Sequence, residues 1–128
     1  MPKIRLWGKL MQTLTLECGG TVAVCPVTME EIGSFGAVRE DLEGFAEQMR
    51  RIKGVRVAAL IRQDPGNRCK LSLRSSGDDD IRSVAALFGG GGHLNASGAT
   101  IDDADMDSVV RQTLKAIQEI TFGKAQAE

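Results

Sequence analysis

The sequence lacks several features that would place a protein in a common functional class. Its 128 residues carry a formal net charge of −1, so no overall basic field attracts nucleic acid, and such a contact needs a local basic patch. We therefore do not expect long duplex DNA as a partner. The sequence also contains neither an apolar run of about 18 residues nor a signal-peptide pattern. A soluble, cytoplasmic protein that does not contact a membrane is expected.

Cysteine and histidine are scarce, which limits the chemistry that the side chains can perform. Three cysteines without CxxC spacing favour small core residues in a reducing cytosol over disulfide bonds or a zinc site. His93 is the only histidine, and no serine or cysteine lies in a nucleophile-elbow pattern, so nucleophilic catalysis is poorly supported. Asp103, Asp105 and Asp107 have the spacing of the first calcium-loop ligands, but Leu114 stands where that loop needs a bidentate acid. We interpret these acids as stabilising the start of the last helix.

The most unusual feature present is a run of four glycines, Gly89 to Gly92, that ends at His93. Glycine loses more backbone entropy on folding than any other residue, so a compact domain keeps such a run where positive φ or close approach of a ligand is needed. We predict a loop whose backbone N–H groups converge on a phosphate or carboxylate, with a flexible connector as the alternative. His93 is placed to bind phosphate or transfer a proton, or it is only a structural hydrogen-bonding residue.

Neither common nucleotide-binding pattern fits this run. A Walker loop requires Lys and then Ser or Thr after its last glycine, and here His93 and Leu94 follow. The dinucleotide-binding pattern requires a glycine at its sixth position, which Leu94 or Asn95 occupies. The run therefore belongs to neither of these two nucleotide-binding folds.

Hydrophobic periodicity predicts one domain in which helices alternate with two hairpins. Apolar residues at helical spacing predict helices at 3–12, 28–32, 42–52, 81–88 and from Asp102 or Asp103 to 117, with fraying after Phe122. Thr28 and Glu31 match a capping box, and Asp79 or Asp80 can cap the helix at 81–88. Alternation around turn residues predicts strands at 13–16, 21–25, 55–62, 68–75 and 99–101. The expected fold class is α/β (α+β), a mixed β-sheet of about five strands with helices packed on it.

The strand predicted at 68–75 is the most informative of these elements. Its period of two directs Cys69, Leu71 and Leu73 to one face and three polar residues to the other, Lys70, Ser72 and Arg74. The shared polar surface is a candidate binding face, and an ordinary solvated sheet face is the alternative interpretation.

The segment Gly89-Gly90-Gly91-Gly92-His93-x-x-Ala96-Ser97-Gly98-Ala99-Thr100 resembles the C-terminal, DHH-associated domain of the DHH-family phosphoesterases. Glu43-Gly44-Phe45, Ser72-Leu73-Arg74-Ser75 and Leu87-Phe88 occur in the order that this family shows, so the resemblance extends over nearly the whole chain. Within the family, the chain is most similar to the bacterial oligoribonuclease and 3′-phosphoadenosine-5′-phosphate (pAp) phosphatase group, the nano-RNases.

The resemblance implies a division of labour within a longer hydrolase. In the family, an N-terminal domain holds a dinuclear manganese centre through residues that include an Asp-His-His triplet, and the C-terminal domain binds the substrate. This chain contains no Asp-His-His and one histidine in total. Residues 1–128 are therefore expected to be a substrate-binding C-terminal domain that holds no metal and no catalytic residue, is inactive alone, and has the manganese-holding DHH domain of the same parent chain as its partner. Met1 then need not be the natural start.

The resemblance also implies roles for individual residues. Six residues belong to the substrate-binding motif, namely Gly89, Gly90, Gly91, Gly92, Asn95 and Gly98. The backbone N–H groups of the glycine run are expected to be directed at the substrate. His93 is expected to contact the phosphate or base, Arg74 to bind the phosphate, and Arg62 to be a weaker candidate for the same task. Leu94 stands where the family commonly has an arginine, so one positive contact is missing.

Three functional hypotheses follow. The first is a module that binds the phosphate end of a short oligonucleotide or a phosphorylated adenosine, using Arg74, the glycine segment and His93. The second is an RNA-binding module like the related domain that ends alanyl-tRNA synthetases. The third is an oligomerisation domain without a ligand. The choice among oligoribonucleotide, pAp and cyclic dinucleotide as substrate stays open, as does the oligomeric state.

Overall fold

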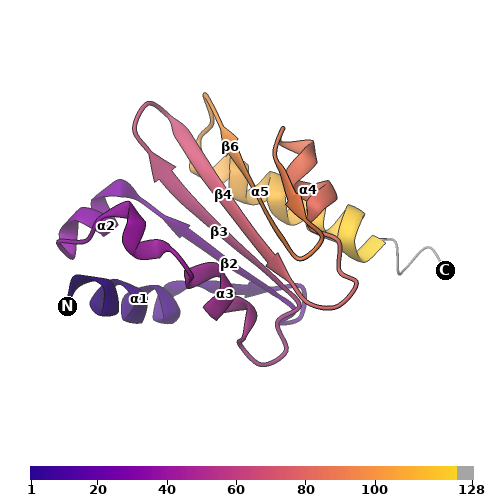
Figure 1. Ribbon diagram of the computed structural model, residues 1–128, viewed down its shortest axis with the longest axis horizontal. Helices are drawn as coiled ribbons and strands as arrows, with labels where there is room; N and C mark the ends of the chain where they lie inside the picture. Colours follow the sequence, from indigo (N-terminus) through magenta and orange to yellow (C-terminus); the bar gives the residue numbers. More distant parts are fainter. Residues whose placement is uncertain (124–128) are drawn as a thin grey trace.

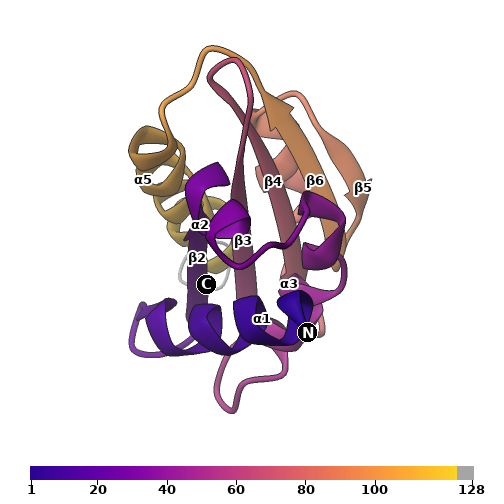
Figure 2. The ribbon, with the colours of Figure 1, turned by 90° about the vertical axis from the view of Figure 1, so that its left-hand side faces the viewer.

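A computed structural model describes residues 1–123, which form one mixed β-sheet with helices on both faces (Figure 1). The six strands are β1 (Thr15–Glu17), β2 (Val22–Val27), β3 (Val57–Asp64), β4 (Arg68–Ser75), β5 (Gly91–His93) and β6 (Ala96–Ile101). Their order in the sheet is β1-β2-β3-β4-β6-β5, and Figure 2 shows β2 to β5 side by side in that order. The pair β2 and β3 is parallel, and the other neighbours are antiparallel. The predicted mixed sheet is confirmed, with one more strand than expected.

The helices divide between the two faces of the sheet. One face carries α1 (Pro2–Thr13), α2 (Met29–Ser34), the 3-10 helix η1 (Arg39–Leu42) and α3 (Phe45–Arg50), and the other carries α4 (Arg82–Leu87), α5 (Met106–Ala116) and its π-helical continuation η2 (Ile117–Phe122) (Figure 1). Each set of helices buries its own apolar cluster against the sheet. No helix within residues 1–123 is long and apolar enough to span a bilayer.

Local sequence signals place several elements as expected. Thr28 caps α2: its hydroxyl accepts a hydrogen bond from the Glu31 N–H at 3.0 Å, while the Glu31 carboxylate accepts one from the Thr28 N–H at 3.1 Å. The Asp80 carboxylate accepts a hydrogen bond from the Ser83 N–H at 3.0 Å at the start of α4. The predicted hairpins β1-β2 and β3-β4 are both present. These predictions are confirmed.

Three boundaries differ from the predictions. The helix expected at 42–52 is shorter, because Gly44 has φ +87° and separates η1 from α3. The last helix does not begin at Asp102 or Asp103: Asp105 caps α5, while Asp103 has φ +50° and the Asp102 carboxylate pairs with Arg68. The strand expected at 99–101 is longer and starts at Ala96. Fraying was predicted after Phe122: Gly123 is still helical, and residues 124–128 lie outside the described residues.

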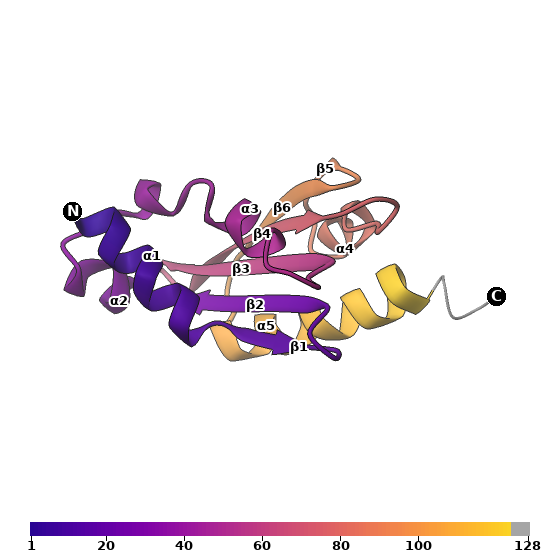
Figure 3. The same cartoon turned by 90° about the horizontal axis from the view of Figure 1, so that it is seen from below.

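The face that carries α1 to α3 is covered over only part of its width. Its buried residues on β2 and β3 include Ala23, Cys25, Ala58 and Leu60. The strand register continues this same face across β4, β6 and β5, where the residues are exposed or half-buried instead. We define this part as the open half-face, and it consists of Lys70, Ser72, Arg74, Ala96, Gly98, Thr100, Gly91 and His93. It reaches the sheet edge formed by β5, opposite the edge formed by β1 (Figure 3).

Candidate functional site

The glycine run forms the end of a helix and then an edge strand. Gly89 has φ +80° after α4, and the N–H groups of Gly89 and Gly90 donate to the carbonyl oxygens of Ala86 and Ala85 at 3.0 and 2.9 Å. The next three residues, Gly91–His93, pair with β6 as the strand β5. Successive N–H groups of a strand point to opposite sides, so the prediction of a loop with N–H groups converging on one anion is wrong. The alternative of a flexible connector is also wrong.

Close packing of backbones explains why three of these positions are glycine. A Cβ atom on Gly90 would overlap the carbonyl oxygen of Gly98 and lie 2.6 Å from the Ala99 Cβ. On Gly92, which has φ +140°, a Cβ would lie 2.6 Å from the Ala96 carbonyl oxygen. On Gly98 it would lie 2.8 Å from the Leu71 carbonyl oxygen. These glycines allow β5, β6 and β4 to approach one another.

Gly91 is the exception within the run. A Cβ atom there would meet no heavy atom within 4 Å, and its φ is not positive. Nothing among residues 1–123 therefore requires glycine at this position. A glycine without a structural cause on an exposed strand is typical of a place where a ligand approaches the backbone.

Arg74 and His93 lie in one row across the open half-face. Arg74 pairs with Ala96, and Ala96 pairs with His93, so the two side chains share a face two strand spacings apart, about 10 Å between their Cα atoms. His93 is exposed, and the Ser97 hydroxyl donates to its carbonyl oxygen at 3.0 Å on the hairpin. The predicted pair is thus brought together on one surface.

The side chain of Asn95 forms hydrogen bonds within the domain. Its side-chain amide donates to the Ser75 hydroxyl at 2.9 Å and to the Gly77 carbonyl oxygen at 3.0 Å. The Ser75 N–H in turn donates to the Asn95 carbonyl oxygen at 3.1 Å. The turn that follows His93 is therefore fixed to the end of β4, which keeps the Arg74 and His93 row in place.

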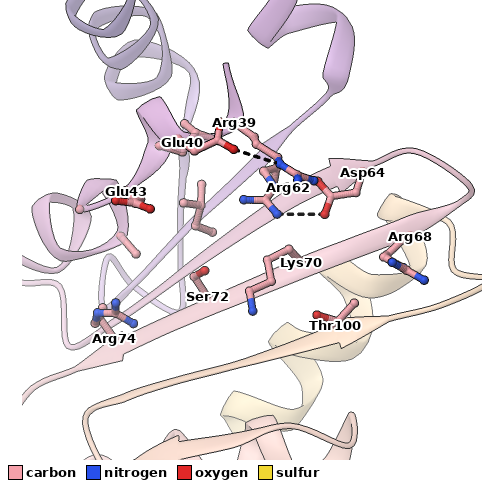
Figure 4. A pocket seen from close by; sticks show the side chains of 14 residues that line it. Arg39, Glu40, Glu43, Arg62, Asp64, Arg68, Lys70, Ser72, Arg74 and Thr100 are labelled. Atoms are coloured by element: carbon pink, nitrogen blue, oxygen red, sulfur yellow. Dashed lines mark hydrogen bonds and ion pairs between the residues drawn. The ribbon is translucent and has the colours of Figure 1, made fainter. Parts of the chain in front are cut away.

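A groove of about 560 Å³ runs along β4 beside this row (Figure 4). Its floor comes from β3, β4 and β6, and its wall comes from residues 39–46 of η1 and α3. Its charged lining residues are Arg39, Glu40, Glu43, Arg62, Asp64, Arg68, Lys70 and Arg74. Strand alternation predicted Lys70, Ser72 and Arg74, and the same alternation places Arg68, which was not predicted, on this face. Thr100 and the wall were not predicted, because their position depends on the packing of distant segments. The groove is within the size range of small-ligand sites, about 300–1,000 Å³.

Most cations of the groove already have a carboxylate partner. Arg62 donates two hydrogen bonds to Asp64, at 2.7 and 2.9 Å, and Arg68 donates one to Asp102 at 2.6 Å. Arg39 lies 3.3 Å from a carboxylate oxygen of Glu40. Within residues 1–123, Arg74 and Lys70 have no carboxylate at ion-pair distance, and Arg74 donates only to the Leu73 carbonyl oxygen at 2.8 Å. Arg74 does lie near enough to Glu47 to contribute, after Arg50 and Arg51, to the lowered pKa of that carboxyl, but the two form no ion pair. Lys70 and Arg74 are therefore the groove cations without an ion pair in the described part of the chain, and an anionic ligand can bind them.

The pair of Arg62 and Asp64 is a stabilising element at the groove. Asp64 is 8% exposed, and the guanidinium of Arg62 holds the pKa of its carboxyl below the usual range through hydrogen bonds. A depressed folded-state pKa means that the pair stabilises the fold above the ordinary carboxyl pKa and that this contribution is lost as the pH falls through the lowered value. Arg62 is therefore neutralised in the fold, and its predicted phosphate contact stays a prediction.

We expect Arg62→Ala to lower the free energy of unfolding by about 2 kcal/mol at pH 7, because it leaves the buried Asp64 carboxylate without its partner. The loss should shrink at pH 3, where protonation of Asp64 makes the missing guanidinium less important. Urea unfolding of both proteins at the two pH values measures it. An equal loss at pH 7 and pH 3 would contradict the assignment of the effect to the ion pair.

No group of three or more His, Cys, Asp or Glu side chains in the described part of the chain is arranged to hold a metal ion. The full sequence offers a single histidine. These residues do not fit a dinuclear manganese centre.

Comparison with known proteins identifies the family. The sequence pattern of the DHHA1 domain matches residues 19–121, which contain five of the six strands, β2 to β6, and the whole open half-face. The chain belongs to the DHHA1 domain family. The family resemblance drawn from the glycine and histidine motif is thereby confirmed.

Two relatives are about 30% identical in sequence to this DHHA1 domain, which aligns with about a third of each relative's length. A Thermus thermophilus protein named bifunctional oligoribonuclease and PAP phosphatase NrnA is 30% identical over 115 residues, which are 90% of this chain and 34% of the relative. The crystal structure of an exopolyphosphatase-related protein from Bacteroides fragilis has a TM-score of 0.85 and 32% identity, covering 94% of this chain and 35% of that one. The DHHA1 chain thus spans about a third of the length of these relatives.

More distant structures share the fold. The Aquifex aeolicus structure titled C-Ala domain of alanyl-tRNA synthetase has a TM-score of 0.56 at 17% identity, covering 75% of this chain and 88% of that one. A Vibrio cholerae structure titled pGpG-specific phosphodiesterase has a TM-score of 0.62 at 13% identity, covering 91% of this chain and 39% of that one. At these identities the likeness concerns the fold alone.

Proposed function

We propose that this DHHA1 domain, residues 1–128, is the substrate-binding part of a DHH-family phosphoesterase and binds the phosphate end of a short oligonucleotide or of a phosphorylated adenosine such as pAp. The observation that carries the proposal is the row formed by Arg74 and His93 on the open half-face, with no carboxylate among residues 1–123 at ion-pair distance from Arg74. The name of the Thermus thermophilus relative, an oligoribonuclease and PAP phosphatase, supports this choice of ligand.

Each residue of the row has a distinct task in this proposal. The planar guanidinium of Arg74 donates charge-assisted hydrogen bonds to two phosphate oxygens. His93 donates a further hydrogen bond from the edge strand β5, which lies on the far side of β6. Gly91 carries no side chain beside His93, so the phosphate can reach the backbone of an edge strand, where alternate N–H groups have no partner in the sheet. Gly90, Gly92 and Gly98 act indirectly, by bringing the three strands together.

Hydrolysis is assigned to another part of the same protein in this proposal. The parent chain supplies the manganese-holding DHH domain, which is the partner that faces the open half-face. The DHHA1 domain then contributes binding and orientation of the phosphate, and residues 1–128 alone are expected to release no product from these substrates.

Titration of a 5′-phosphorylated trinucleotide against wild type, Arg74→Ala and His93→Ala tests the proposal. We expect Arg74→Ala to weaken binding about 10- to 100-fold, as for loss of a charge-assisted hydrogen bond, and His93→Ala to weaken it about 3- to 10-fold. Arg111→Ala is the matched control, because Arg111 is exposed on α5 on the opposite face of the sheet and should not affect binding. Equal affinities in all four proteins would reject the proposal.

The salt dependence of the same titration separates the alternatives. One to a few phosphate contacts predict a shallow dependence of affinity on salt, whereas an extended backbone contact with structured RNA predicts a steep one. A steep slope together with preference for tRNA would favour the RNA-binding alternative. Absence of nucleotide binding together with a dimer in solution would favour the oligomerisation alternative.

A further inference from the structure

We propose that the open half-face holds a second anion subsite at Lys70, so that the domain binds two phosphates of one short oligonucleotide rather than its end alone. This inference rests on the proposed function, because it places the first phosphate at Arg74 and His93. It adds a residue outside the glycine and histidine motif and predicts a preference for ligand length.

The charge distribution of the groove points to Lys70. Of the five cationic side chains that line the groove, three have carboxylate partners, namely Arg39, Arg62 and Arg68. Lys70 is half-buried and, among residues 1–123, has neither a hydrogen bond nor an ion pair. An unpaired ammonium held in a polar groove is a natural partner for a phosphate.

The spacing along β4 separates the two cations by a fixed length. Lys70 and Arg74 lie four residues apart on one face of the strand, which places their Cα atoms about 13 Å apart. Lys70 pairs across the sheet with Thr100, whose exposed hydroxyl offers a further donor at this end of the groove. Figure 4 shows Ser72 between Lys70 and Arg74 along β4.

The floor between the two cations carries only small side chains. Ser72 pairs with Gly98, and Gly98 pairs with Gly91, so the middle row across β4, β6 and β5 offers one hydroxyl and two bare backbones. A sugar-phosphate chain can therefore lie flat on the sheet between the subsites. Residues 39–46 close the groove along its other side.

The lining residues also determine which part of the ligand is recognised. Among residues 1–123, no aromatic side chain lines the groove, so no base can stack on an aromatic ring there as it does in typical single-strand binding sites. Recognition then depends on the phosphates and the sugar, and it is tolerant of base sequence. The expected ligand is a di- or trinucleotide with two phosphates in reach of Arg74 and Lys70.

A comparison of two ligands tests the second subsite. A 5′-phosphorylated trinucleotide and 5′-AMP are titrated against wild type, Lys70→Ala, Lys70→Arg and Arg74→Ala, with Lys115→Ala on α5 as the charge-matched control. We expect Lys70→Ala to weaken trinucleotide binding about 3- to 10-fold and to reduce its salt slope by about one, while binding of AMP is unchanged. Lys70→Arg should restore trinucleotide binding, and Arg74→Ala should weaken binding of both ligands.

The outcomes separate the two proposals. If Arg74→Ala weakens both ligands and Lys70→Ala affects neither, the second subsite is wrong and the proposed function stands. If Lys70→Ala weakens AMP as much as the trinucleotide, Lys70 belongs to the first subsite and the inference is again wrong. If Arg74→Ala affects neither ligand, the proposed function itself fails.

Discussion

Gly90→Ala is expected to destabilise the domain by about 3 kcal/mol or more, whereas Gly91→Ala should change its stability by less than about 1 kcal/mol. The two glycines are neighbours in sequence, but a Cβ on Gly90 would overlap the Gly98 carbonyl oxygen and press on Ala99, while one on Gly91 would point into open space. The Gly90 substitution forces the junction of α4 and β5 away from β6. The Gly91 substitution removes only backbone freedom, chiefly from the unfolded chain.

Gly91→Ala, which should hardly affect stability, is expected to affect ligand binding. If the phosphate approaches the backbone at Gly91, the added methyl group weakens trinucleotide binding although the fold is intact. Urea unfolding of both variants, followed by titration of Gly91→Ala, measures the two effects. Wild-type affinity in Gly91→Ala would show that the ligand does not approach this residue, and wild-type stability in Gly90→Ala would contradict the packing of β5 against β6.

Elements that depend on neighbours in sequence were predicted well. The Thr28 and Glu31 capping box and the β3-β4 hairpin need only a few adjacent residues with the right donors, turn formers or alternation. The polar row of β4 followed from a period of two, and this row carries Arg74. The missed strand was β5, because Gly91 and Gly92 have little intrinsic tendency to form a strand and join the sheet only through pairing with β6.

Which cations of the groove are paired with a carboxylate was not predicted from the sequence. Arg62 and Arg74 are equivalent as residue types, but Asp64 lies on the same face of β3 as Arg62 and takes up its guanidinium. Arg68 is neutralised by Asp102, a residue 34 positions away in the chain. The pairing of Arg62 is thus local to β3, whereas the pairing of Arg68 depends on tertiary packing. The groove wall at residues 39–46 also depends on tertiary packing.

That wall packs on the core beneath it, and an aromatic contact in this core leads to the last prediction. Phe45 of α3 is fully buried, and its ring meets the Trp7 ring edge to face with centroids 5.2 Å apart. The Trp7 indole N–H donates to the Asp41 carbonyl oxygen of η1 at 2.7 Å. Phe45 therefore supports α3 directly and η1 through Trp7, in addition to the buried Leu42 of η1 and Met49 of α3.

Phe45→Ala is expected to lower the free energy of unfolding by about 3–5 kcal/mol, and Phe45→Leu by a smaller amount, because the leucine refills part of the cavity. Trp7 is the only tryptophan, so its fluorescence reports directly on this contact. In folded Phe45→Ala we expect red-shifted emission and weaker trinucleotide binding, since the wall at η1 loosens. Unshifted emission with wild-type binding would mean that the hydrogen bond from Trp7 to Asp41 holds the wall without Phe45, and the groove would then be independent of the core beneath α3.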